Sequence, residues 1–109
     1  MAAITIMSSD PTTGNLTLSD HGSTNAGRGE KVTWVIGPKS GVESISDINI
    51  KTGSINVFDP EPAPVGSSKN WQGIVKKDIP IPSVEEYNIH WKDGAGKTHT
   101  YDPQIRVNK

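Results

Sequence analysis

Residues 86–107 constrain the fold of this chain more than any other segment. Tyr87, Ile89 and Trp91 alternate with polar residues up to a glycine-containing turn at residues 93–96. This pattern predicts a β-hairpin, and residues 104–107 predict a closing strand after it. The segment contains no thiolate and no recognisable cofactor loop, so it indicates architecture and says little about activity.

The composition extends this β pattern to the whole chain. With 109 residues, the chain can form one hydrophobic core and one domain, residues 1–109. Eleven glycines and eight prolines interrupt the short Ile- and Val-rich runs too often for helices of ordinary length. We therefore expect an all-β fold, a single Greek-key β-sandwich of about seven to nine strands.

Short apolar runs mark the expected strands: residues 4–6, 16–18, 32–36, 42–50, 55–58 and 71–75. The run at 42–50 does not keep a single period, which predicts a β-bulge or two short pieces. Residues 20–29 hold three glycines, and residues 59–68 hold three prolines, so both are expected to be surface loops. Two further prolines make residues 79–82 an edge strand or a connection.

The charges and the termini exclude several classes of partner. Eleven basic and twelve acidic residues are well mixed and give a net charge of -1, so we expect neither nucleic-acid nor membrane binding. The chain has no cysteine, which rules out disulfides and thiolate metal sites. Residues 1–7 lack the basic region and the apolar stretch of a signal peptide. We expect a cytoplasmic protein by default, and unconventional export would leave the same sequence.

His90 and His99, in the expected hairpin, are candidate metal ligands. A two-residue loop and a four-residue loop both pair His90 with His99, on the face away from the core. Imidazole is a good ligand for zinc, copper and nickel, but no third ligand lies at a fixed spacing. We therefore expect no metal cofactor, and divalent-metal binding through this pair is an alternative.

The chain lacks the motifs that would indicate catalysis. Residues 94–98 match the end of a phosphate-binding P-loop, but Trp91 stands where the motif needs its first glycine. No Gly-x-Ser-x-Gly elbow or Ser, His and Asp set with a triad spacing is present. Glu85 and Glu86 point to opposite faces of a strand, so they cannot act together on one substrate. We expect a protein that is not an enzyme and has no cofactor.

Trp71 is the candidate for ligand contact. Trp34 and Trp91 are in phase with core residues, whereas Trp71 follows the long proline-containing loop. An exposed indole there, with Asn70 beside it and His21 in the glycine-rich loop, could stack on a sugar. Packing of Trp71 in the core is the other interpretation.

Two segments resemble the cupredoxin-like β-sandwich of the small blue copper proteins. Residues 29–34, Gly-Glu-Lys-Val-Thr-Trp, are similar to the opening of its central strand, and residues 87–91 are similar to its Tyr-x-Phe-x-Cys strand. Trp91 occupies the position of the copper-binding cysteine. Residues 37–43 and 92–96, which correspond to the copper loops, also lack the family's histidine and methionine ligands. The resemblance therefore implies the fold without blue-copper chemistry. An immunoglobulin-like sandwich would satisfy the same periodicity.

The chain also resembles small uncharacterised proteins of the Bacteroidetes. The shared segments are the Gly-x-x-Val-x-Trp strand, residues 70–73 (Asn-Trp-Gln-Gly) and residues 98–103 (Thr-His-Thr-Tyr-Asp-Pro). This resemblance implies a bacterial protein and brings no function with it.

Together these features predict a metal-free, non-enzymatic binding or protein-interaction module. We expect its partner to be an unidentified protein or a glycan, with self-association into a homo-oligomer as the first form to consider. The expected binding face consists of the loop at 59–70, Trp71 and the loop at 20–29, because loops at the end of a sandwich vary while its strands hold them in place. A carbohydrate-binding module using Trp71 is an alternative.

Overall fold

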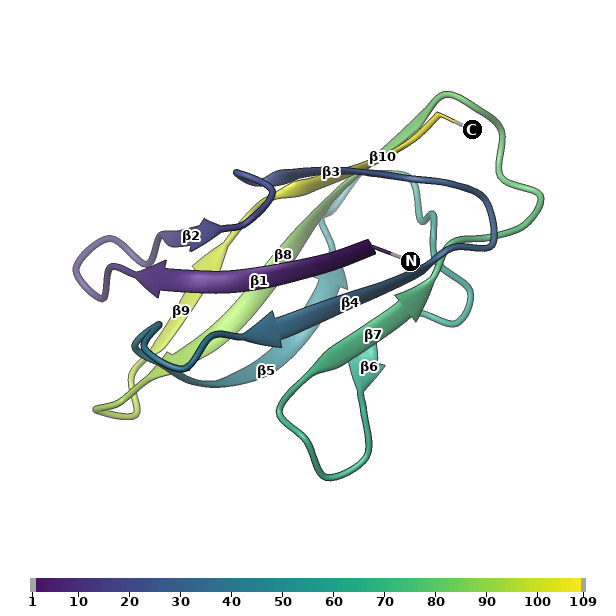
Figure 1. Ribbon diagram of the computed structural model, residues 1–109. Coiled ribbons are helices and arrows are strands. Elements are labelled where there is room, and N and C mark those ends of the chain that lie inside the picture. The colour runs from purple at the N-terminus through teal and green to yellow at the C-terminus, as the bar shows by residue number, and fades with distance from the viewer. Residues whose placement is uncertain (1, 109) are drawn as a thin grey trace.

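The computed structural model describes residues 2–108, which form two facing β-sheets around one core (Figure 1). The strands are β1 (Ala2–Ser9), β2 (Leu16–Leu18), β3 (Ser23–Ala26), β4 (Lys31–Ile36), β5 (Val42–Ile50), β6 (Ala63–Pro64), β7 (Trp71–Ile74), β8 (Ser83–Asp93), β9 (Thr98–Tyr101) and β10 (Gln104–Val107). One sheet has the order β2-β1-β4-β7-β6. The other has the order β3-β10-β8-β5, and β9 also pairs with β8. The expected all-β sandwich is confirmed.

Both sheets are mixed. β1 runs parallel to β4 in the first sheet, and β3 runs parallel to β10 in the second. The other named pairs are antiparallel. Parallel neighbours cannot be joined by a hairpin, and β1 and β4 are joined through β2 and then β3 of the opposite sheet. The chain changes sheet after β2, β3, β4, β5 and β7 (Figure 1).

The core lies between the sheets and follows from the alternation of side chains. In β8, every second residue from Ser83 to Asp93 is buried, and Tyr87, Ile89 and Trp91 are its large apolar members. Trp34 of β4 meets them from the opposite sheet. Its indole Nε1 donates a hydrogen bond to the hydroxyl of Tyr87 at 3.1 Å, and its ring packs edge-on against Phe58. The one polar atom of the central indole is therefore paired without water.

β5 contains the irregularity that its sequence predicts. Its pairing with β8 shifts register between Val42 and Ser44 and again between Ile45 and Asp47. Each bulge adds one residue to β5, so the next apolar side chain points to the core again. Val42, Ile45 and Ile48 are therefore all buried.

Three segments differ from the expectation. Residues 20–29 include β3, whose inward residues Thr24 and Ala26 are buried but too small to give an apolar signal. Residues 59–68 include the two-residue β6. Residues 55–58 form only an isolated bridge from Phe58 to Val75, because the adjacent Val57 and Phe58 are both buried and so break the alternation. The described part of the chain therefore has ten strands.

No helix in residues 2–108 has the length and apolar character needed to cross a membrane.

Candidate functional site

The β8–β9 hairpin has a three-residue loop, residues 94–96. Asp93 N–H donates to Lys97 O at 3.0 Å, and Gly96 N–H donates to Asp93 O at 3.0 Å. Gly96 has a φ of 83°, the left-handed conformation that ends a loop of this length. The expected loops had two or four residues, so the observed pairing of β8 with β9 is shifted by one residue from the expected pairing.

This register separates the two candidate histidines. His90 lies opposite Thr100, and His99 lies opposite Trp91, so the two imidazoles are on opposite faces of the sheet. The expectation that His90 and His99 form a pair is wrong. Among residues 2–108, no three His, Asp or Glu side chains gather as metal ligands. His90 instead contacts Thr100 Oγ1 at 3.0 Å and Asn49 Oδ1 at 3.3 Å on the outer face.

His99 is held between Trp91 and Asp93. Its ring stacks on the Trp91 indole with centroids 4.4 Å apart, and its Nε2 lies 2.8 Å from Asp93 Oδ2. Asp93 Oδ1 accepts hydrogen bonds from Ala95 N–H at 2.9 Å and Lys97 N–H at 3.0 Å. The hydrogen bond that the Asp93 carboxylate accepts from His99, and to a smaller extent that from Lys97 N–H, holds the pKa of Asp93 below its usual value. Both carboxylate oxygens therefore serve to hold the hairpin in shape.

Trp91 connects this hairpin to the opposite sheet. Its indole Nε1 donates to Gly14 O at 3.1 Å, in the turn between β1 and β2. The buried Trp91 and Asp93 and the half-buried His99 thus form a connected support at one end of the sandwich.

An open hollow of about 520 Å³ lies at this end. Three chain segments line it: Ser8, Ser9 and Pro11 at the end of β1, residues 39–41 between β4 and β5, and residues 93–95 of the hairpin. In Figure 1 these three turns lie at the same end of the sheets, where the arrowheads of β1 and β4 point. We call this feature the turn-end hollow.

One wall of the turn-end hollow is fixed by a serine pair. Ser9 Oγ donates to Ser40 O at 2.6 Å, and Ser40 Oγ accepts from Val42 N–H at 3.3 Å. Gly41, with a φ of 81°, lies so close that a Cβ there would come within 2.7 Å of Ser9 Oγ. A side chain at position 41 would disturb this wall, so the sequence needs glycine here.

The three sequence-predicted ligand residues do not come together. Trp71 is only 7% exposed and lies opposite Trp34 in the β4–β7 pair, so the interpretation of core packing is correct and that of an exposed indole is wrong. Asn70 lies in the β6–β7 loop, where its carbonyl accepts from Val65 N–H at 2.9 Å. His21 is exposed in the β2–β3 turn, and Figure 1 places that turn on the opposite side of the molecule from the β6–β7 loop. The expected common face of these loops is therefore also wrong.

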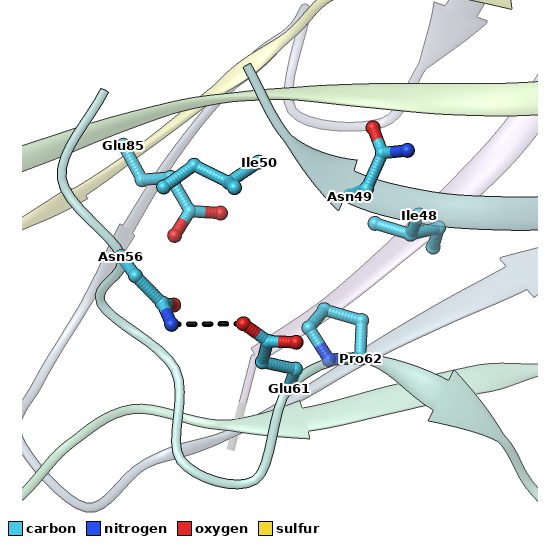
Figure 2. Close-up of a pocket in the computed structure, with 7 residues that line it drawn as sticks. All are labelled: Ile48, Asn49, Ile50, Asn56, Glu61, Pro62 and Glu85. Carbon is cyan, nitrogen blue, oxygen red and sulfur yellow. Dashed lines mark hydrogen bonds between the residues drawn. The ribbon is translucent and has the colours of Figure 1, made fainter. Parts of the chain in front are cut away.

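A second, smaller cavity of about 70 Å³ lies beside Glu85 (Figure 2). Glu85 is in phase with Tyr87 and Ile89 on β8, and only 2% of it is exposed, whereas Glu86 is on the outer face. Burial raises the pKa of the Glu85 carboxyl to about 7. The position of an acid within an apolar alternation was the available sequence signal for this site.

The chain matches no known protein family and no curated protein when compared with them.

Proposed function

We propose that the protein is a non-enzymatic binding module and that the turn-end hollow is its ligand-binding region. The observation that carries this proposal is the convergence of three turns, drawn from both sheets, around one open hollow of about 520 Å³. Ligand pockets in proteins typically have volumes of ~300–1,000 Å³. Loops held by a rigid scaffold are also where binding residues concentrate.

The lining favours a ligand rich in hydrogen-bond acceptors. Asp93 uses both carboxylate oxygens within its own hairpin, so its charge is already compensated. Lys39 is exposed and makes no hydrogen bond or ion pair within residues 2–108. Its ammonium group and the hydroxyl of the exposed Ser8 are donors in the lining of the hollow, and a carboxylate or carbonyl group would accept from them.

The cupredoxin-like resemblance supports the same region. The mixed sheets, with two parallel pairs, differ from the two antiparallel sheets of an immunoglobulin constant-type sandwich. The segments that correspond to the copper loops of cupredoxins, residues 37–43 and 92–96, both contribute to the turn-end hollow. In this proposal, the chain uses the end of the sandwich for binding without the metal.

An NMR screen of small carboxylates and short peptides would test the proposal. We expect hits to shift the backbone amides of residues 39–41 and 93–95, with Lys39→Ala weakening the carboxylate hits. Ala95→Trp, which places a large ring at the hollow, should abolish them. Lys92→Ala is the matched control, because Lys92 is an exposed cation on the same hairpin outside the hollow. Hits that map elsewhere, or equal binding to Ala95→Trp, would contradict the proposal.

Self-association is a second candidate, supported by one apolar patch. Ile55 is 55% exposed and Val84 is 41% exposed, and both line the same shallow hollow. The strands that end the two sheet orders are poor sites for strand addition. β2 and β3 have three and four residues, β6 has two residues and contains Pro64, and the longer β5 carries two bulges. A homodimer would therefore use this patch instead of an edge. Light scattering should then show a dimer that Val84→Lys converts to a monomer.

A further inference from the structure

Glu85 is almost fully buried, yet one of its carboxyl oxygens remains open to a cavity. Its Oε1 accepts from Val57 N–H at 2.9 Å, while its Oε2 has no hydrogen-bond partner among residues 2–108. Figure 2 shows the carboxyl group directed into the 70 Å³ cavity. No buried side-chain oxygen among residues 2–108 lacks a partner, so Oε2 is reached by solvent through this cavity, and a donor that enters the cavity can bind it.

The polar groups around the cavity are mainly acceptors. Figure 2 shows Glu61 directing its carboxyl toward the same space as Glu85 from the opposite side. Asn56 holds Glu61 in place, because its Nδ2 donates to Glu61 Oε1 at 2.9 Å. The other amide atom, Asn56 Oδ1, accepts from Phe58 N–H at 3.0 Å. Two carboxyl groups therefore face one space, which favours a donor that enters it from solvent.

The remaining wall is mostly hydrocarbon, with Asn49 as its one further polar residue among those described. Ile48, Ile50 and Pro62 line the cavity beside the carboxyl groups. Calcium and magnesium need six or more oxygen ligands and would lose their water shell against these walls. An organic cation can place its charged head at the carboxyl groups and its methylene groups against the side chains.

We propose that this cavity binds a primary alkylammonium group, the head group shared by free aliphatic amines and lysine side chains. An ammonium carries three donors in a compact volume, which matches Glu85 Oε2 and the Glu61 carboxyl. The cavity of about 70 Å³ exceeds the ~10–15 Å³ that a single water molecule needs on the same measure, so it has room for the head group. The site shares no residue with the turn-end hollow, so this proposal does not depend on the proposed function.

The charges that face Glu85 predict how pH acts on the site. Burial and the nearby Glu61 raise the pKa of Glu85, whereas the hydrogen bond from Val57 and the charge of Lys76 lower it, and the net result is about 7. The ammonium binds the ionised carboxylate, so its affinity should rise with pH and level off above about pH 7. Below that, each pH unit should weaken binding by up to about tenfold.

An NMR titration at about pH 8 with n-butylamine would test this proposal. We expect saturable shifts of the backbone amides of residues 48–50, 56–57 and 61, and a much smaller effect at about pH 5.5. Glu85→Gln keeps an acceptor for Val57 N–H but removes the charge, so it should weaken binding at least about tenfold. Glu86→Gln, the exposed neighbour on the same strand, should leave binding unchanged.

Further probes separate the sources and the alternatives. Butanol, which has the same chain without the charge, should give no saturable shift, and tetramethylammonium, which has no N–H donor, should bind poorly. Putrescine represents free amines and Nα-acetyl-lysine methylamide represents a lysine side chain, and binding of either one supports the site. Glu61→Gln provides a surface variant that should weaken binding even if Glu85→Gln does not fold. Absence of saturable shifts with every amine, or unchanged butylamine binding by both variants, would overturn the proposal.

Discussion

The imidazole of His99 stacks on the indole of Trp91 directly across the β8–β9 ladder, with ring planes 30° apart. This pair lies on the core side of the hairpin, while His90 lies on the outer side. The two histidines therefore have different tasks: His99 packs and holds Asp93, and His90 belongs to a polar surface with Asn49 and Thr100.

We expect His99→Ala to lower the free energy of unfolding by about 1–2 kcal/mol, because it removes the stack on Trp91 and the partner of Asp93. His90→Ala should cost less than about 0.5 kcal/mol, since its hydrogen bonds are exposed to water. Urea denaturation of both variants measures the difference. An equal loss of unfolding free energy in the two variants would contradict the β8–β9 register, which places the two histidines on opposite faces.

The hairpin loop gives a second prediction, from a matched pair of glycines. A Cβ atom added at either Gly94 or Gly96 would meet no heavy atom of another segment within 4 Å, so steric crowding is the same for both. Only Gly96 has a positive φ, at 83°. Gly96→Ala should therefore destabilise the protein by about 1 kcal/mol, whereas Gly94→Ala should be neutral or slightly stabilising. Thermal unfolding of the two variants checks this, and a larger loss for Gly94→Ala would exclude the three-residue loop.

The sequence predicts the strands well wherever large apolar residues alternate, as they do in β4 and β8. It fails at β3, because Thr24 and Ala26 are buried but too small to be distinguished from loop residues. It also fails at residues 55–58, where Val57 donates its N–H to the side chain of Glu85 and not to a neighbouring strand. In each case a tertiary contact decides the structure, and local periodicity does not contain that information.

The candidate sites were harder to predict than the fold. Loop lengths of two and four residues gave the same pairing of His90 with His99, and a single additional loop residue moved every side chain of β9 to the other face. Asp93 followed by two glycines within the loop was compatible with the observed three-residue form. The turn-end hollow depends on turns far apart in the sequence, so it could not be read from any one of them.

Glu85 predicts an unusual pH dependence of stability. Its pKa is about 7 in the folded protein against 4.5 when unperturbed, so the folded state binds more protons between these values. The free energy of unfolding should therefore fall as pH rises through this window. The fall should be on the order of 2 kcal/mol, less than the full pKa shift would give, because water in the cavity screens the carboxyl. The lowered pKa of Asp93 acts below this window, where its stabilisation is lost as the carboxylate becomes protonated.

Urea denaturation from about pH 4.5 to about pH 8, in the absence of amines, measures this dependence. Glu85→Gln should remove the decline, and the control Glu86→Gln should retain it. A wild-type profile parallel to that of Glu85→Gln would show that Glu85 ionises normally in the folded state.

The hydrogen bond between the Trp34 indole and the Tyr87 hydroxyl joins the two sheets at the centre of the core, and its removal should be costly. Tyr87→Phe removes the acceptor and leaves the buried Nε1–H of Trp34 without a partner, which should cost about 1–3 kcal/mol. Burial raises the pKa of Tyr87, so its hydroxyl stays neutral and this cost should not change across the accessible pH range. Tyr101→Phe is the matched control: Tyr101 is only partly buried, and we expect a loss below about 0.5 kcal/mol. Chemical denaturation followed by tryptophan fluorescence compares the two, and equal stabilities would mean that Trp34 finds another acceptor when the hydroxyl is removed.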